Sequence, residues 1–175
     1  GCHALIYLDH NATAPMLPEA KEAWLEACER FPGNPSSPHR MGARADKALE
    51  EARVQLGELL GCSPLDLVWT SGATESNNTI LSHYARTLPP DVPVWITSVE
   101  HPSVIESAVA LFADRVRWIP VDPSGVVHAD WIETRLRTER PGFVSVMAAN
   151  NETGVLQPWQ SVQRLCLEAG VPFLC

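Results

Sequence analysis

Apolar residues recur at helical spacing in several stretches of this chain, and short apolar runs separate those stretches. The helical spacing predicts helices over residues 18–31, 41–60, 74–88, 104–113, 130–137 and 158–169. Short runs rich in Val, Ile, Trp and Phe predict strands over residues 5–8, 67–70, 93–97, 116–121, 143–148 and 171–174. Strand and helix then alternate, which is typical of βαβ units and of a mainly parallel sheet.

The alternation divides the chain in two. Residues 1–60 read as an N-terminal helical segment, and residues 61–175 as an alternating β/α core. We therefore predict a three-layer α/β fold, with helices on both faces of the sheet. On the helix predicted over residues 41–60 an apolar stripe alternates with charged positions that we expect to face solvent. The stripe consists of Ala45, Ala48, Leu49, Ala52, Leu56, Leu59 and Leu60, and the charged side of Arg44, Lys47, Glu50, Glu51 and Arg53.

Composition narrows the class of protein. Of 175 residues, 45% are hydrophobic and 19% are charged, as in a soluble globular protein. The formal net charge of −8 argues against a nucleic-acid surface, and no apolar run is long enough to predict a membrane span. Scattered cysteines without Cys-x-x-Cys spacing favour reduced thiols in a cytoplasm, and the six histidines show no metal-ligand spacing.

Small polar residues follow the strand predicted over residues 67–70. Gly72 lets the backbone turn sharply there, and Ala73 and Thr74 would then start a helix. Because the first amides of a helix are unpaired and lie at the positive end of its dipole, this pattern favours an anion, most often a phosphate. An ordinary strand–turn–helix corner is the alternative that this stretch by itself leaves open.

Two further polar stretches come directly after predicted strands. His101 follows the strand over residues 93–97, and Asn150 and Asn151 follow the strand over residues 143–148. In parallel sheets ligands gather at the carboxyl ends of the strands, so these side chains are expected near one another. Each also has a local explanation: a surface histidine in a loop, and a turn that Asn and Gly favour.

Five stretches together resemble the cysteine desulfurases, in the class V aminotransferase group of pyridoxal-phosphate enzymes. They are Leu-Asp-His-Asn-Ala-Thr-Ala-Pro at 8–15, Gly-Asn-Pro-Ser-Ser-Pro-His at 33–39, Ser-Gly-Ala-Thr-Glu-Ser-Asn at 71–77, Glu-His at 100–101 and Asn-Asn-Glu-Thr-Gly at 150–154. The resemblance covers nearly the whole chain. Two positions depart from the family pattern: Ala14 stands where Thr is common, and Leu174 where His is frequent.

The resemblance implies roles for individual residues. Ala73 and Thr74 would hold the phosphate of pyridoxal 5′-phosphate. His101 would stack on the pyridine ring and assist proton transfer as the catalytic residue, and Asn151 would donate a hydrogen bond to the phenolic oxygen of the cofactor. The reaction implied converts L-cysteine to L-alanine and leaves persulfide sulfur on the enzyme. That sulfur would pass to an acceptor such as an iron–sulfur scaffold protein, and a cytoplasmic homodimer is expected.

Two groups that this chemistry requires are not found in the sequence. The lysine that forms a Schiff base with the cofactor has no counterpart, because Lys21 and Lys47 lie on predicted helices away from strand ends. The nucleophilic cysteine belongs to a loop further along the family sequence, and Cys175 is expected to end a buried strand instead. We therefore expect the N-terminal part of the large cofactor-binding domain, either truncated or part of a longer chain, and unable by itself to turn over cysteine.

Other functions remain open on the sequence. A selenocysteine lyase or a cystine C–S lyase could use the same scaffold, and the residues that would distinguish them are not among these. A non-catalytic, truncated paralogue acting as a binding or dimerisation partner is the third possibility, favoured by the missing lysine. The intact cofactor-facing motifs oppose it, since a pure interaction module has no need of them.

Overall fold

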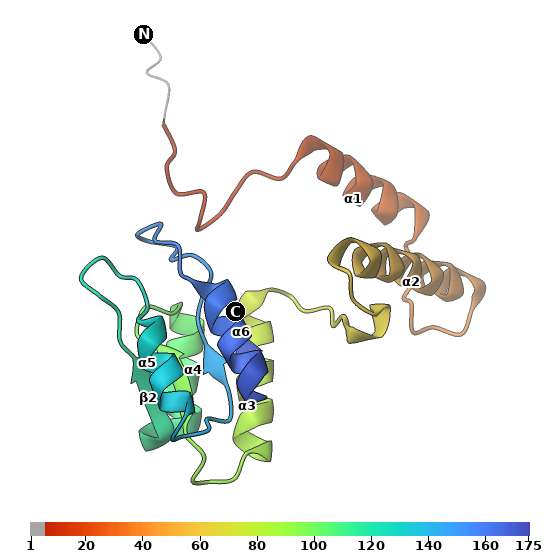
Figure 1. The fold of residues 1–175 in the computed structure, drawn as a ribbon. Coiled ribbons are helices and arrows are strands. Elements are labelled where there is room, and N and C mark those ends of the chain that lie inside the picture. The colour runs from red at the N-terminus through yellow and green to blue at the C-terminus, as the bar shows by residue number, and fades with distance from the viewer. Residues whose placement is uncertain (1–5) are drawn as a thin grey trace. The chain divides into compact units, whose positions relative to one another are not determined.

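The computed structural model describes residues 6–175, and the chain divides into two compact units, Gly1–Trp69 and Thr70–Cys175 (Figure 1). All six predicted helices are present, each within two residues of its predicted bounds. Leu5, the first residue of the strand predicted over residues 5–8, lies outside the described residues, and residues 6–8 form no strand. Within the described part of the chain, no helix is both long and apolar enough to cross a membrane.

The first unit consists of helices α1 (Pro18–Arg30) and α2 (Arg40–Leu60), followed by the 3-10 turn η1 (Pro64–Asp66). Pro18 starts α1, because its fixed φ suits the first helical turn. Gly61 ends α2 in the left-handed conformation, with φ of 68°. No residue of α1 is buried. In α2 the buried residues are Gly42, Ala45 and Gly57.

The predicted division of α2 into an apolar and a solvated side needs correction. Leu59 is 81% exposed, although it belongs to the predicted apolar stripe. Arg53, expected in solvent, has a side chain only 18% exposed. Its guanidinium donates to the carbonyl of Leu67 and lies 5.4 Å from the centre of the Trp69 ring. Arg53 therefore fastens the segment after η1 to α2, a contact between positions far apart in sequence that periodicity cannot indicate.

The strand predicted over residues 67–70 does not form. Val68 is 78% exposed and Trp69 is 47% exposed, so these apolar side chains contact no sheet face. A strand requires a neighbouring strand for its backbone hydrogen bonds, and this segment is paired with none of the described strands. The residues at these positions have a local preference for strand, but no described strand pairs with them, and the prediction of a strand here is wrong.

The second unit is built on a four-stranded, all-parallel sheet in the order β2-β1-β3-β4. Its strands are β1 (Val94–Thr97), β2 (Val116–Ile119), β3 (Val144–Ser145) and β4 (Phe173–Leu174). Helix α3 (Ala73–Thr87) precedes β1. Between the strands run α4 (Pro102–Phe112), the turn η2 (Ala113–Arg115), α5 (Ala129–Leu136) and α6 (Trp159–Ala169).

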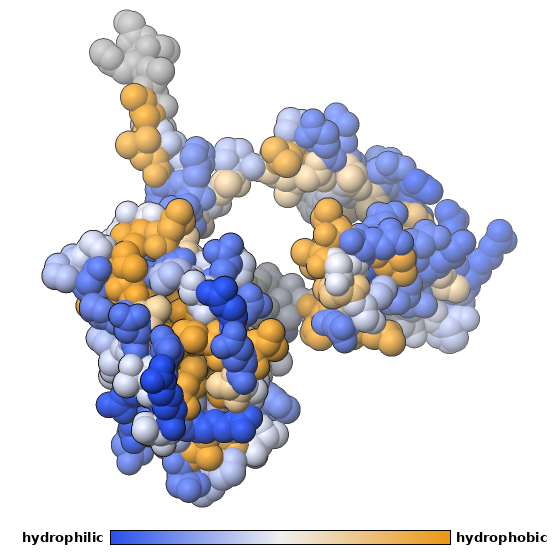
Figure 2. Space-filling view, in the orientation of Figure 1, coloured by the Kyte–Doolittle hydropathy of each residue, from blue (hydrophilic) through white to orange (hydrophobic). Residues whose placement is uncertain are grey.

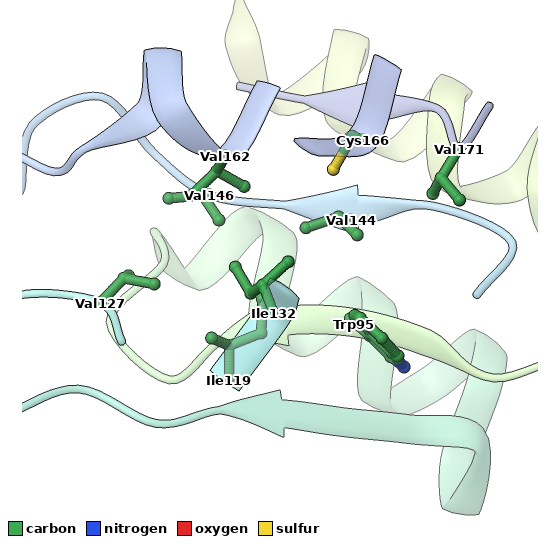
Figure 3. Packing of buried hydrophobic residues seen from close by; sticks show 9 residues of the cluster. All are labelled: Trp95, Ile119, Val127, Ile132, Val144, Val146, Val162, Cys166 and Val171. Atoms are coloured by element: carbon green, nitrogen blue, oxygen red, sulfur yellow. The ribbon is translucent and has the colours of Figure 1, made fainter. Parts of the chain in front are cut away.

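Successive residues of the central strand β1 point to opposite faces of this sheet, and each face has its own apolar cluster. Trp95 belongs to a cluster with Ile132 of α5 and with Val162 and Cys166 of α6 (Figure 3). Val94 and Ile96 belong to a second cluster, on the side of α3 and α4. The members of that cluster are Leu81, Val94, Ile96, Val104, Ala108, Phe112, Val116 and Phe143. The predicted three-layer α/β fold is therefore confirmed.

Three predicted strands are shorter than their sequences indicate. The run over residues 143–148 pairs only at Val144 and Ser145, although residues 141–146 are all buried. The strand over 116–121 ends at Ile119, and that over 171–174 pairs only at Phe173 and Leu174. Cys175 is exposed rather than the end of a buried strand. Residues are thus buried beyond those that pair with a neighbouring strand.

Candidate functional site

Helix α3 begins with a network of short polar side chains. Glu75 reaches back from the first turn and accepts hydrogen bonds from the amide and the hydroxyl of Ser71, each at 2.7 Å. Both bonds lower the pKa of Glu75, and the bond from the Ser71 hydroxyl has the larger effect. The hydroxyls of Thr70 and Ser76 lie 2.8 Å apart across the same turn. These bonds resemble a capping box and hold the start of α3 in one conformation.

Ala73 and Thr74, the predicted phosphate-binding pair, occupy the first two positions of α3 and are exposed. The first backbone bond of the helix runs from Ser76 to the carbonyl of Gly72, and the amides of Ala73 and Thr74 have no acceptor among the described residues. The sharp turn predicted at Gly72 is wrong, because its φ of 162° is extended backbone that other residues adopt. An added Cβ would instead meet nothing within 4 Å, so the space in front of this turn is open.

His101, the predicted catalytic residue, follows β1 and caps α4. Its Nδ1 accepts from the Ser103 amide at 3.1 Å, and the Ser103 hydroxyl lies 2.8 Å from the same nitrogen. The side-chain amide of Asn77, on α3, donates to that hydroxyl at 2.9 Å. His101 is therefore linked through Ser103 to the first turns of α3, the helix that starts with Ala73 and Thr74.

Glu100, beside His101, is a residue of this edge that the sequence did not single out. It is only 8% exposed and accepts from the Ser145 hydroxyl at 3.2 Å, and from the backbone amides of Met147 and His101. Burial is the largest influence on this carboxyl and raises its pKa to about 6. Glu100 joins the end of β1 to the end of β3, and only its position directly after a predicted strand could have indicated this.

Asn150, the neighbour of the predicted cofactor ligand Asn151, organises the loop after β3. Its Oδ1 accepts from the amide of Glu152 at 3.0 Å, and from the amide and hydroxyl of Thr153 at 2.8 and 3.1 Å. Its Nδ2 donates to the carbonyl of Val99 at 3.0 Å. Because Val99 lies two residues before His101, Asn150 ties the loop of Asn151 to the loop of the predicted catalytic residue.

The structure thus brings the three sequence motifs of the second unit to one edge of the sheet. The Asn77–Ser103–His101 hydrogen bonds join the start of α3 to the end of β1, and Asn150 joins the end of β1 to the loop of Asn151. The sequence motifs include Glu100 and Asn150 but do not predict the contacts that they make, and they give no role to Ser103. No cluster of His, Cys, Asp or Glu that could hold a metal ion occurs among the described residues.

A parallel α/β sheet with polar loops and a free helix start at its carboxyl edge defines a class of ligand-binding α/β proteins. The family model for aminotransferase class-V matches residues 6–175, and the chain belongs to this family. The cysteine desulfurase IscS of Rickettsia bellii is 37% identical over 172 residues, which is 96% of this chain and 42% of that protein. The cysteine desulfurase IscS of Rickettsia felis is 36% identical over the same shares.

Solved structures agree with this assignment. A NifS-like protein superposes with a TM-score of 0.84 at 33% identity, covering 97% of this chain and 51% of the other. A NifS-like protein from Rickettsia africae gives a TM-score of 0.79 at 30% identity, covering 97% and 47%. The protein SspA, solved in complex with cysteine, gives a TM-score of 0.84 at 27% identity. The chain spans less than half the length of the curated relatives that it matches.

Proposed function

We propose that this chain forms part of the cofactor-binding domain of a cysteine desulfurase that uses pyridoxal 5′-phosphate. The observation that carries the proposal is the joining of three motifs at one sheet edge in a chain 37% identical to a protein of that name. The residues fit the cofactor: unpaired first-turn amides suit its phosphate, a histidine ring suits its aromatic face, and a carboxamide suits its phenolic oxygen.

In this proposal Ala73 and Thr74 bind the phosphate through the free amides at the start of α3, assisted by the dipole of the helix. His101 lies against the pyridine ring, and Asn151 donates to the phenolic oxygen. When bound, the cofactor supplies an electron sink that weakens the bond between Cβ and sulfur in L-cysteine. Asn150 and Glu100 contact no ligand in this scheme. Their hydrogen bonds hold the loops of Asn151 and His101 in place relative to one another.

The partners follow from the same assignment. L-Cysteine is the substrate, a proposal supported by SspA, the structural relative solved with cysteine. The sulfur would be delivered to an acceptor protein such as an iron–sulfur scaffold, and the enzyme would act as a homodimer in the cytoplasm. The described cysteines Cys28, Cys62, Cys166 and Cys175 are all free thiols.

Alanine release from L-cysteine by the native protein tests this function. We expect alanine and persulfide sulfur in equal amounts, and a much slower reaction with L-cystine. The 175-residue chain alone, with Lys21 and Lys47 as its only lysines, is expected to release no alanine. Release of alanine from selenocysteine but not from cysteine would replace the proposed substrate, and the absence of bound pyridoxal phosphate in the native protein would refute the proposal.

A further inference from the structure

The ring of His101 is held by two hydrogen bonds to the same nitrogen. Nδ1 lies 3.1 Å from the Ser103 amide nitrogen and 2.8 Å from the Ser103 hydroxyl oxygen. That hydroxyl is in turn 2.9 Å from the side-chain nitrogen of Asn77. The ring is exposed, and Nε2 has no partner among residues 6–175. His101 is thus fixed at one nitrogen and open at the other.

The direction of this chain of bonds is set by the backbone. The Ser103 amide can only donate, so Nδ1 must be an acceptor and carries no proton. The Ser103 hydroxyl therefore donates its own proton to Nδ1, and its oxygen is left to accept from the amide group of Asn77. In the neutral ring the proton is consequently on Nε2, the nitrogen that faces away from these partners.

We propose that Asn77 and Ser103 are positioning residues that hold His101 as the Nε2–H tautomer and present that N–H at the sheet edge. In this form the exposed nitrogen donates a hydrogen bond and cannot accept a proton. Both hydrogen bonds are made at Nδ1, on the edge of the ring, so they restrict its orientation and leave its faces available for stacking. The identity of the ligand at this edge rests on the proposed function, whereas the tautomer does not.

The same helix pair contains a natural control one residue along α3. Asn78 accepts from the Ser107 hydroxyl at 2.9 Å and donates to the carbonyl of Thr74 at 2.8 Å. This second Asn–Ser pair also links α3 to α4 but touches no histidine. A change at Asn77 can therefore be compared with the same change at Asn78, which alters charge and helix packing to a similar extent.

The direct test is the ring nitrogen spectrum of His101 in the ¹⁵N-labelled 175-residue chain, recorded by NMR at an alkaline pH where the ring is neutral. We expect Nδ1 to resonate as an unprotonated nitrogen and Nε2 as a protonated one. In Asn77→Asp the new carboxylate can only accept a hydrogen bond, so the Ser103 hydroxyl donates to it. The oxygen of that hydroxyl is then an acceptor toward Nδ1. The ratio of Nε2–H to Nδ1–H tautomer should then fall roughly fivefold or more, as the loss of one hydrogen bond implies.

Two variants complete the comparison. Asn78→Asp carries the same added charge and is expected to keep the wild-type tautomer. Ser103→Ala keeps the backbone amide and should keep Nε2–H as the main form. A protonated Nδ1 in the wild-type chain, or a tautomer ratio unchanged by Asn77→Asp in a chain that is still folded by circular dichroism, would overturn the inference.

Affinity for pyridoxal 5′-phosphate, measured on the same samples, separates this inference from the proposed function. We expect Asn77→Asp to weaken binding more than Asn78→Asp does, although both add one negative charge. If the wild-type chain shows the expected tautomer and does not bind the cofactor, the positioning role stands and the proposed ligand is wrong. If it binds the cofactor with equal affinity in both variants although Asn77→Asp changes the tautomer, the tautomer has no part in binding, and its role at the cofactor site is refuted.

Discussion

The two units bury their apolar residues to very different extents. In the unit Thr70–Cys175 all four residues of β1 are buried, and apolar clusters cover both faces of the sheet. In the unit Gly1–Trp69 helix α1 has no buried residue, and large apolar side chains such as Trp24 and Leu59 are exposed. Hydrophobic residues are visible on the surface of this unit (Figure 2). Stability therefore resides mainly in the α/β unit.

The two units also differ in the contacts of a histidine that caps a helix. Both units contain a helix capped by histidine, at His39 and at His101, and in each the Nδ1 accepts a backbone amide at 3.1 Å. Only His101 is also bonded to a serine hydroxyl that a second helix holds in place. Capping alone therefore indicates no function, and the bond to the Ser103 hydroxyl, which Asn77 holds in place, is what distinguishes His101 from His39.

Removing a large core side chain should give the largest contrast between the units. Phe143 is fully buried, with the rings of Tyr84 and Phe112 centred 4.9 and 5.6 Å from its own. Phe143→Ala is expected to lower the free energy of unfolding by about 3–5 kcal/mol. Trp24→Ala, at a 60% exposed position, should change it by less than about 0.5 kcal/mol. Urea unfolding measures both, and similar losses at the two positions would contradict the difference in packing.

The buried carboxyl of Glu100 should make the stability of the α/β unit depend on pH. Its pKa is raised from 4.5 to about 6, so the native state keeps a proton that the unfolded state releases between these values. The free energy of unfolding should therefore fall by about 2 kcal/mol as pH rises through this window.

Urea unfolding of the wild-type chain and of Glu100→Gln at pH values on either side of the window checks this dependence. The substitution is expected to remove most of the fall, because an amide does not ionise. Glu106→Gln, at an exposed position of α4, is the matched control and should retain it. A fall of the same size in Glu100→Gln would place its source at another group.

Two asparagines allow a comparison of turns. Asn150 accepts three hydrogen bonds and donates one to Val99, whereas the side chain of Asn34 accepts a single bond, from Ser36. We expect Asn150→Ala to lower the free energy of unfolding by about 1–3 kcal/mol, and Asn34→Ala by about 1 kcal/mol or less. Hydrogen exchange of the Thr153 amide should accelerate in Asn150→Ala alone. An unchanged rate there would show that other contacts hold the loop.

The two histidine caps should give small and equal effects on stability and the clearest separation of function. His39→Ala and His101→Ala are each expected to cost about 1 kcal/mol of folding free energy, the usual contribution of a helix cap. Affinity for pyridoxal 5′-phosphate should fall in His101→Ala and remain unchanged in His39→Ala. Equal affinity in both variants would remove His101 from the cofactor site.

Helix bounds were predictable because their signals are local. Pro18 starts α1 and Gly61 ends α2, and no contact from elsewhere in the chain is needed to read them. Strands were predicted less well, since residues 67–70 have strand propensity without a partner and β3 pairs over only two residues. Pairing is set by residues distant in sequence, which a single sequence does not reveal.

The same limit applies to the site. The rule that ligands bind at the carboxyl ends of parallel strands predicts that the loops of His101 and Asn151 lie near one another, and the structure joins these loops through Asn150 and Val99. It could not show that Asn77 reaches Ser103, or that Asn150 reaches Val99, because those contacts cross between helices and loops. Gly72 shows a prediction from residue type that is wrong. Its residue type predicts a sharp turn, whereas the structure has extended backbone there with open space around it.

The central claim is that the free helix start at Ala73 and Thr74 binds the phosphate of pyridoxal 5′-phosphate. Equilibrium binding of pyridoxal 5′-phosphate and of pyridoxal, which lacks the phosphate, to the wild-type chain tests it most directly. His39→Ala is the control, whose affinity should remain unchanged. We predict saturable binding of one pyridoxal phosphate per chain, competition by inorganic phosphate and much weaker binding of pyridoxal. Equal affinity for the two compounds, or attachment after borohydride reduction at Lys21 or Lys47 with no competition by phosphate, would contradict it.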